Sequence, residues 1–544
     1  MAHNPHPQGL SRRDILKGMA LAAAGTMVAA APVYGRPASG GGWPTEALNT
    51  SAATAVDSAQ FISETQFRTW GQELDDIGLR ATGSPEHEAY IQKLAGELEA
   101  AGVSDVRLEP FPMRRWLATD WGLRVDGAVL PAPSYVPYSG NTDAAGISGR
   151  VVYLDDQAFS NPSSIPPLAG AIVVYDVPLT SLPLLAFKAL QYPGTLQNPG
   201  TMLDPHAELS DIGFYTRPWF NGAADRIDRL KELGAAGSIG ILDLNEHWAT
   251  GQYFPYDGKF REIPSLYVDR DTGARLRAAA TAGQTATIVL QADIDEVVSH
   301  NVVGFIPGMS DELTLLHTHT DGTNGLEENG QYGILAAAQY LARLPIEARP
   351  RTIAILLASG HFLDGIGTLS FLADHLDDLV PRLTAAITVE HLGAMEYLPT
   401  PDGDVRATGR HEPGIFFSSG GRAGVDAAAS MLRRANAAPA GVARAFLPNK
   451  FGKPDSPVNV EPHLAPLRAI PRPPLYFPGE GTYLYSVGNL ADSNYITGPY
   501  YLLSAGMPTV DKIDFARMRD LSMALVGQTL ELAAATRAEI AAFT

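Results

Sequence analysis

Residues 313–344 read LTLLHTHTDGTNGLEENGQYGILAAAQYLARL and contain a short apolar run, a polar loop and a longer apolar run. The run Leu313–His317 has the length of a buried strand, and Tyr332–Leu344 repeats its apolar residues at helical spacing. The same order continues in the segments Thr352–Ala358 (strand), Ile366–Leu376 (helix) and Ala385–Val389 (strand). Strands that alternate with helices form mainly parallel sheets. We therefore predict an α/β fold with a mixed, mainly parallel sheet and helices on both faces.

The segments before this stretch predict a second, smaller unit inserted into the first. Residues 45–134 contain a helix that begins at Ser84 and Pro85, with serine as the cap and proline as the first helical residue. Between residues 135 and 296, short β-rich runs are separated by Pro, Gly and polar loops, which is typical of a small β-rich domain. We expect residues 135–296 to form a sheet of their own. The flanking segments, 45–134 and 297–544, should together build the α/β domain.

The composition excludes several classes of protein. The chain has 544 residues, 59 acidic against 40 basic side chains, a formal net charge of −19 and no cysteine. Such acidity excludes nucleic acid and disfavours anionic membrane surfaces as partners. The lack of cysteine excludes disulfides, thiolate metal sites and a cysteine nucleophile.

The first 40 residues predict a targeting segment. Residues 11–17, SRRDILK, resemble a twin-arginine export signal and precede an Ala-rich run from Met19 to Ala31. This run is too short for an ordinary membrane span and lies behind a basic flank, as the apolar part of a signal peptide does. No other segment reaches about 18 continuous apolar residues, so we expect no stable membrane insertion after signal removal. We therefore predict that residues 1–40 direct export by the twin-arginine route to the periplasm or the extracellular space.

Polar, metal-capable side chains follow three of the predicted strands. In chain order, they are His317, His319 and Asp321, then His361, then Glu390 and His391. Because ligands bind beyond the carboxyl ends of strands in open α/β sheets, these side chains predict a site at one sheet edge. In the pair His319 and Asp321, the carboxylate can accept a hydrogen bond from one ring nitrogen, which leaves the other nitrogen for a metal. Glu328, before the predicted helix, adds a candidate oxygen ligand.

These motifs are similar to those of a known family, the zinc metallopeptidases that include bacterial aminopeptidases, glutamate carboxypeptidase, glutaminyl cyclases and the inactive transferrin receptor. The similarity covers nearly all of the chain after the signal. It lies in residues 78–84 (GLRATGS), 301–308 (NVVGFIPG), 319–321 (HTD) and 510–514 (VDKID). Residues 135–296 resemble the protease-associated domain inserted in many members. The resemblance implies a zinc-exopeptidase-like fold and hydrolysis of peptide or amide bonds.

The resemblance also implies ligands for one metal. The positions that match the ligands of the family's first metal are His319, Glu328 (followed by Asn329) and Glu390. Asp321 matches the carboxylate that orients the histidine. All of these side chains have the donor atoms that the role requires.

The ligands of the family's second metal are not matched in this chain. The family has a Glu-Glu pair, a general base followed by a ligand of the second metal, and this pair falls on His361 and Phe362. Phenylalanine cannot bind a metal. The family's last ligand is a histidine near the end of the chain, yet the last histidine here is His463. The resemblance therefore implies one divalent metal, with zinc as the expected ion.

Three functions are open from the sequence. The first is an exported hydrolase of peptide or small amide substrates with one metal, in which His361 replaces glutamate as the base. The second is a non-catalytic binding protein on the same fold, which the loss of the Glu-Glu pair favours. The third is a hydrolase with a Ser or His nucleophile in the same cleft, although the chain has no Gly-x-Ser-x-Gly elbow. The substrate and the oligomeric state are left open.

Overall fold

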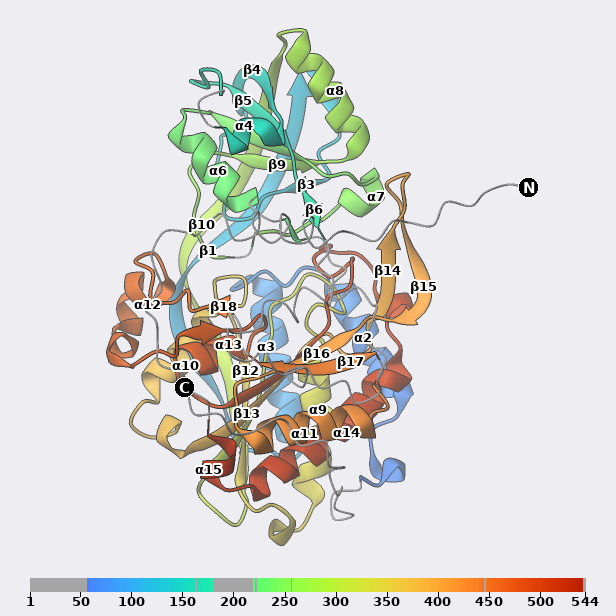
Figure 1. Ribbon diagram of the computed structural model, residues 1–544, viewed down its shortest axis with the longest axis vertical. Coiled ribbons are helices and arrows are strands. Elements are labelled where there is room, and N and C mark those ends of the chain that lie inside the picture. The colour runs from blue at the N-terminus through green and yellow to red at the C-terminus, as the bar shows by residue number, and fades with distance from the viewer. Residues whose placement is uncertain are drawn as a thin grey trace, which may run out of the picture.

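The computed structural model describes residues 56–161, 165–180, 219–220, 223–255, 257–437, 439–444 and 447–541. The predicted signal peptide, residues 1–40, lies outside the described residues. The described chain forms a larger and a smaller lobe, the lower and upper parts of Figure 1, joined by two long strands. Within this part of the chain, no helix has the length and apolar character that a membrane span needs.

The two long strands are β1 (Ser104–Val125) and β10 (Thr285–Ile306), which pair in antiparallel orientation over most of their length. The lower end of β10 pairs with β12 in the larger lobe, and its upper end pairs with β4 in the smaller lobe. Among the described residues, fourteen strands therefore share one hydrogen-bonded path, in the order β17-β16-β20-β13-β11-β12-β10-β4-β5-β8-β9-β3, with β1 and β2 attached at β10.

The prediction that residues 135–296 form a sheet of their own is therefore wrong. The physical reason is that β10 is a single 22-residue strand, whose backbone hydrogen bonds continue through residue 296 without a break. The upper end of β1 also belongs to the smaller lobe, because Leu123 and Val125 pack in the core of that lobe with Ile172. The division at residues 134 and 296 stays a prediction.

The larger lobe has a mainly parallel sheet between two layers of helices. Its helices are α2 (Glu64–Ile77), α3 (Pro85–Ala100), α9 (Gly330–Arg343), α10 (Ile366–Asp374), α11 (Arg422–Arg434), α12 (Pro457–Val460), α13 (Thr482–Ser486), α14 (Phe515–Ala534) and α15 (Arg537–Ile540). Its strands are β11 (Leu313–His319), β12 (Thr352–Ala358), β13 (Leu383–Val389), β16 (Gly414–Ser418), β17 (Ala440–Arg444) and β20 (Asp492–Ile496), with the antiparallel pairs β14 (Met395–Pro399) with β15 (Val405–His411) and β18 (Leu447–Pro448) with β19 (Leu475–Tyr476).

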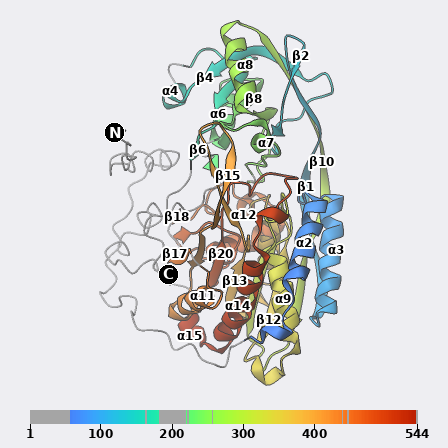
Figure 2. The same cartoon turned by 90° about the vertical axis from the view of Figure 1, so that its right-hand side faces the viewer.

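Alternate residues of β12 pack against different helix layers. Ile355 and Leu357 lie in the core that α2, α3, α9, α11 and α14 build on one face. Ala354 and Leu356 lie in the core that α10 and α13 build on the other face. Successive side chains of a strand point to opposite faces, so a strand that is apolar at every position requires cover on both sides. Figure 2 shows these layers from the side, and the predicted α/β fold class is confirmed.

The smaller lobe is a β-rich unit with its own core. Its strands are β2 (Ala128–Leu130), β3 (Ser134–Tyr135), β4 (Ile147–Leu154), β5 (Ile172–Asp176), β6 (Leu179–Thr180), β7 (Trp219–Phe220), β8 (Gly237–Ile241) and β9 (Ser265–Val268), and its helices are α4 (Asp156–Ser160), α6 (Ala223–Glu232), α7 (Glu246–Ala249) and α8 (Arg270–Thr281). The β14–β15 hairpin of the larger lobe extends to the smaller lobe (Figure 1). There the indole nitrogen of Trp248 donates to the Asp404 carboxylate at 2.9 Å. The two lobes are thus in contact beside the long strands as well as through them.

Three parallel strands end at the same edge of the larger sheet. β11 lies between β12 and β13, and its last residue, His319, is level with Ala358 at the end of β12. β13 ends at Val389, directly before Glu390. The loops that leave these strands therefore start from one place, as the sequence predicted.

Candidate functional site

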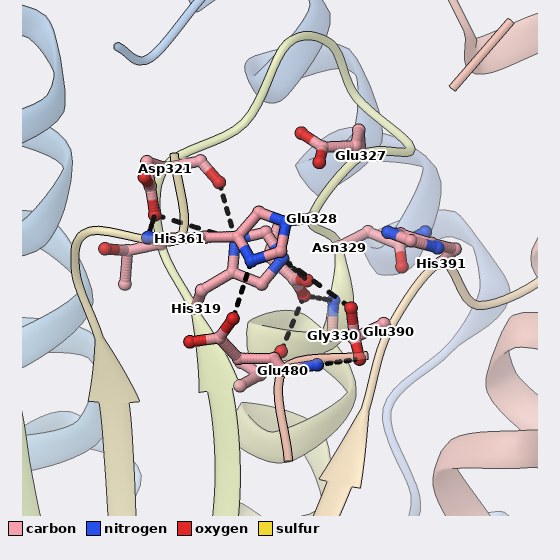
Figure 3. Close-up of polar contacts among 12 residues, drawn as sticks. His319, Asp321, Glu327, Glu328, Asn329, Gly330, His361, Glu390, His391 and Glu480 are labelled. Atoms are coloured by element: carbon pink, nitrogen blue, oxygen red, sulfur yellow. Dashed lines mark hydrogen bonds and ion pairs between the residues drawn. The ribbon is translucent and has the colours of Figure 1, made fainter. Parts of the chain in front are cut away.

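Four buried side chains with metal-capable atoms meet at this edge. They are His319 at the end of β11, Glu328 in the loop before α9, and Glu390 and His391 directly after β13. One nitrogen or carboxylate oxygen from each of the four lies within 4.8 Å of the others, and all four residues are buried. Figure 3 shows them meeting where the strands that carry His319 and Glu390 end. The structure thus brings together the three predicted ligands and adds a second histidine.

His319 has one ring nitrogen fixed and the other facing carboxylates. Its Nδ1 donates to the backbone carbonyl oxygen of Asp321 at 2.8 Å. A carbonyl oxygen can only accept, so Nδ1 carries a proton, and the neutral form of the ring has its lone pair on Nε2. Nε2 lies 2.9 Å from Glu328 Oε2 and 3.9 Å from Glu390 Oε2. Burial lowers the pKa of His319, but Glu328 and Asp321 outweigh it and raise that pKa well above its ordinary value.

Asp321 does not orient His319 in the expected way. Its carboxylate lies 3.6 Å from His319 Nδ1, beyond hydrogen-bond distance, and the backbone carbonyl of the same residue takes the proton instead. The carboxylate accepts from Thr82 Oγ1 at 2.5 Å and from the backbone nitrogens of His361 and Phe362 at 3.1 and 3.0 Å. These three donors engage both oxygens of the carboxylate. Asp321 therefore anchors the loop that carries His361, and the predicted hydrogen bond from its side chain to His319 is wrong.

Glu328 is held by the chain around it. Its Oε1 accepts from Thr318 Oγ1 at 2.9 Å and from the backbone nitrogen of Gly330, which leaves Oε2 directed at His319. Its backbone φ is 65°, in the left-handed region that non-glycine residues rarely adopt. Strain of this kind is often found at functional sites, where the surrounding structure maintains it.

The two carboxylate oxygens of Glu390 also have different partners. Its Oε1 accepts from the backbone nitrogen of Glu480 at 2.9 Å and from Asn494 Nδ2 at 2.8 Å. Its Oε2 is the oxygen that faces His319. Burial raises the pKa of Glu390 to about 7, with His319 opposing the shift.

The donor atoms fit a metal ion. Among the described residues, His319 Nε2 and Glu328 Oε2 are buried without a hydrogen bond of good geometry, and their close contact is the 2.9 Å pair that they form with each other. Buried polar atoms without partners are rare and call for an explanation such as an ion. A tetrahedral ion with bonds of about 2.0–2.2 Å keeps its ligand atoms about 3.4 Å apart. The separations of 2.9 and 3.9 Å around Nε2 lie on either side of that spacing.

His361 forms a second part of the site with a glutamate that the sequence analysis missed. The ring of His361 stacks on the ring of His319, with centroids 4.1 Å apart, and its Nδ1 lies 2.6 Å from Glu480 Oε2. Thr368 Oγ1 donates to the other oxygen of Glu480 at 3.2 Å. Burial lowers the pKa of His361 to about 4, an effect that His319 strengthens, whereas burial raises the pKa of Glu480 to about 8.

Glu327 is another buried carboxylate at the site that sequence reasoning passed over. One of its oxygens lies within 4.8 Å of nitrogens of His319 and His361. Oε2 accepts from the backbone nitrogen of Thr323 at 2.9 Å, and burial raises the pKa of Glu327 to about 7. The adjacent acidic pair at 327 and 328 was visible in the sequence, but nothing there showed that both members turn inward.

The position where the family resemblance requires a second-metal ligand is apolar. Phe362 is fully buried, and its ring lies 4.9 Å from the ring of Tyr253, which the segment after α7 supplies. The side chain of Phe362 has no lone pair to offer a cation at this place. The number of metal ions that the site holds stays a prediction.

Comparisons with known proteins support the fold. No protein-family model matches the sequence, and no curated protein matches it either. Among solved structures, the chain is similar to an aminopeptidase from Aneurinibacillus sp. strain AM-1, with 13% identity over 88% of this chain and 95% of that chain and a TM-score of 0.53. It is also similar to BSAP, a zinc aminopeptidase from Bacillus subtilis, with 12% identity over 88% and 98% and a TM-score of 0.55. A peptidase M28 precursor from Shewanella amazonensis SB2B gives 16% identity over 87% and 98% and a TM-score of 0.56.

At these identities the likeness shows a shared fold. The resemblance stated from the sequence motifs is confirmed at that level, because the matches extend over almost all of each solved chain. The site itself has to be interpreted from the side chains of this protein.

Proposed function

Since this chain has the fold of the zinc aminopeptidases, we propose that it is a metal-dependent hydrolase of peptide or amide bonds with a single divalent ion. The observation that carries the proposal is the buried group of His319, Glu328 and Glu390, in which a histidine nitrogen faces two carboxylate oxygens. Three protein ligands with a position left for water or substrate are typical of a catalytic zinc site. Zinc is the expected ion because imidazole and carboxylate ligands suit it, and the chain has no thiolate to offer.

The bound metal would supply Lewis acidity, which polarises a carbonyl and lowers the pKa of water. The chain's own residues perform the remaining tasks. Glu328 and Glu390 would balance the charge of the ion, and each keeps one oxygen in hydrogen bonds to the protein, so that the other oxygen stays in place. Their rigid support favours a site that is organised before substrate arrives.

His361 is the proposed base. It stands beside His319, and the ionised form of Glu480 accepts the proton of its Nδ1, which makes the other ring nitrogen the proton acceptor in that form. This is the arrangement in which a carboxylate fixes the tautomer of a catalytic histidine. Asp321 contributes by holding the backbone of the same residue. Positioned general bases contribute about 10²- to 10⁴-fold to hydrolytic rates.

A nucleophilic serine is less well supported. Ser359, the serine nearest to His361 in the sequence, shares a hydrogen bond of 2.7 Å with Ser299, and Ser299 in turn donates to Glu88 at 2.6 Å. Neither bond involves His361. The hypothesis of a non-catalytic binding protein is supported by one observation, the apolar side chain of Phe362.

Export belongs to the same proposal. The twin-arginine motif and the Ala-rich run within residues 1–40 support a location outside the cytoplasm. A substrate met there would be a peptide or a small amide rather than nucleic acid, as the net charge of −19 suggests.

Metal removal tests the proposed function. Dialysis against a chelator should abolish hydrolysis of a panel of aminoacyl and blocked peptide amides, and one equivalent of zinc per chain should restore it. Rates before and after reloading, with circular dichroism to confirm an unchanged fold, provide the measurement. Full activity in chelated protein would favour a metal-independent nucleophile. Inactivity of the metal-loaded protein on every substrate would favour the binding protein.

A further inference from the structure

We propose that His391 is a fourth ligand of this metal, so that the site contains two imidazoles and two carboxylates. The inference rests on the proposed function, which places an ion at His319, Glu328 and Glu390. The family resemblance gives ligand roles to those three residues and none to His391.

The backbone brings His391 to the same side as its neighbour. Consecutive side chains of an extended strand point to opposite faces, so Glu390 and a following histidine would normally diverge. His391 instead has a φ of 55°, in the left-handed region, directly after β13 ends. This turn places an atom of its ring within 4.8 Å of atoms of His319, Glu328 and Glu390. Glu328 has the same unusual backbone conformation, so two members of the group depart from regular geometry where they meet.

The ring of His391 is held as a ligand would be. Its Nδ1 donates to the backbone carbonyl oxygen of Thr497 at 2.7 Å, and Thr497 Oγ1 donates back to the His391 carbonyl at 2.9 Å. The proton on Nδ1 leaves the lone pair on Nε2. His319 is fixed in the same tautomer by the carbonyl of Asp321. A hydrogen bond from the non-coordinating nitrogen to a backbone carbonyl is the usual support of a metal-bound histidine.

The charges agree with an ion held by these four groups. A divalent cation with two carboxylates and two neutral imidazoles has no net charge, which suits residues as deeply buried as these. A second nitrogen donor also biases the site away from magnesium and calcium, which prefer oxygen. Zinc, iron and cobalt accept such mixed ligands, and zinc can expand to five ligands during reaction.

The absence of cysteine in the chain permits a direct test with cobalt(II). In His391→Cys, a thiolate bound to cobalt should give an intense sulfur-to-metal charge-transfer band in the near ultraviolet, which the wild type cannot show. In His391→Gln, competition with a chromophoric chelator should reveal zinc binding at least about 100-fold weaker, beyond the 10- to 100-fold typical of a lost supporting group. The control is the same pair of changes at His247, an exposed histidine.

The outcomes separate this inference from the proposed function. The band in His391→Cys, together with weakened zinc binding in His391→Gln and no effect at His247, would support ligation. Wild-type zinc affinity in His391→Gln and no band in His391→Cys would overturn the assignment of His391 as a ligand. If His319→Ala nevertheless lost the metal, the three-ligand site would still be supported. Metal binding that survives His319→Ala as well would reject the metal site altogether.

Discussion

Replacing His319 by alanine should remove both the metal and the activity. Its Nε2 faces both carboxylates of the site, so its loss deletes the central donor atom. The two glutamates would then remain with at most one nitrogen donor, that of His391, and a site so rich in oxygen binds zinc more weakly. We expect no zinc after purification and hydrolysis reduced to the background rate. Zinc content by elemental analysis and kcat/KM on the best substrate are the measurements.

This variant needs a control for stability, because His319 and Glu328 form a buried ion pair in the absence of metal. Removing one partner of such a pair destabilises a protein by about 3–5 kcal/mol. His319→Gln retains much of the volume and a polar side chain, so it should fold better while still failing to bind zinc. His247→Ala, on the surface, should change neither property. Wild-type zinc content in a folded His319→Gln protein would contradict the assignment.

Replacing His361 should remove activity but leave the metal. In His361→Asn the side chain can still contact Glu480, yet it has no nitrogen that accepts a proton near neutral pH. We expect kcat to fall by about 10²- to 10⁴-fold, as is usual for the loss of a general base. Zinc content should stay at the wild-type value, since the proposed role of His361 is proton transfer. A loss of zinc in this variant would instead make His361 a ligand.

Glu480→Gln tests the same proton transfer by His361 through the residue that positions it. A glutamine amide can donate to His361 Nδ1, which would favour the opposite tautomer and put the proton on the nitrogen that should act as the base. We expect a fall in kcat with little change in KM and no loss of zinc. An unchanged kcat would show that Glu480 has no part in positioning the base.

Much of the fold could be predicted from the sequence because it depends on local patterns of apolar residues and helix caps. The strand and helix predicted within residues 313–344 appear where apolar spacing placed them, as β11 and α9. The capped start of α3 at Ser84 and Pro85 is also as predicted, with Ser84 accepting from the backbone nitrogen of His87. The single sheet was not readable, because nothing local indicates that the strand from Thr285 to Ile306 continues between two lobes.

The residues of the site could be predicted from the sequence only in part. His319, Glu328 and Glu390 follow strand ends or precede a helix, and topology brings such positions together. Glu480 comes from a loop 90 residues after Glu390, and no spacing rule connects the two. The place of His391 depends on a left-handed backbone conformation that the strand pattern argues against.

The number of metal ions bound per chain tests the account most directly. Phe362, at the position that matches a ligand of the family's second metal, is apolar and fully buried, so a second ion would lack that ligand. Elemental analysis of the full chain, purified without chelator, should therefore find one zinc or similar divalent ion per chain. Two tightly bound ions would contradict the single-metal site, and none would contradict the metal-dependent hydrolase itself.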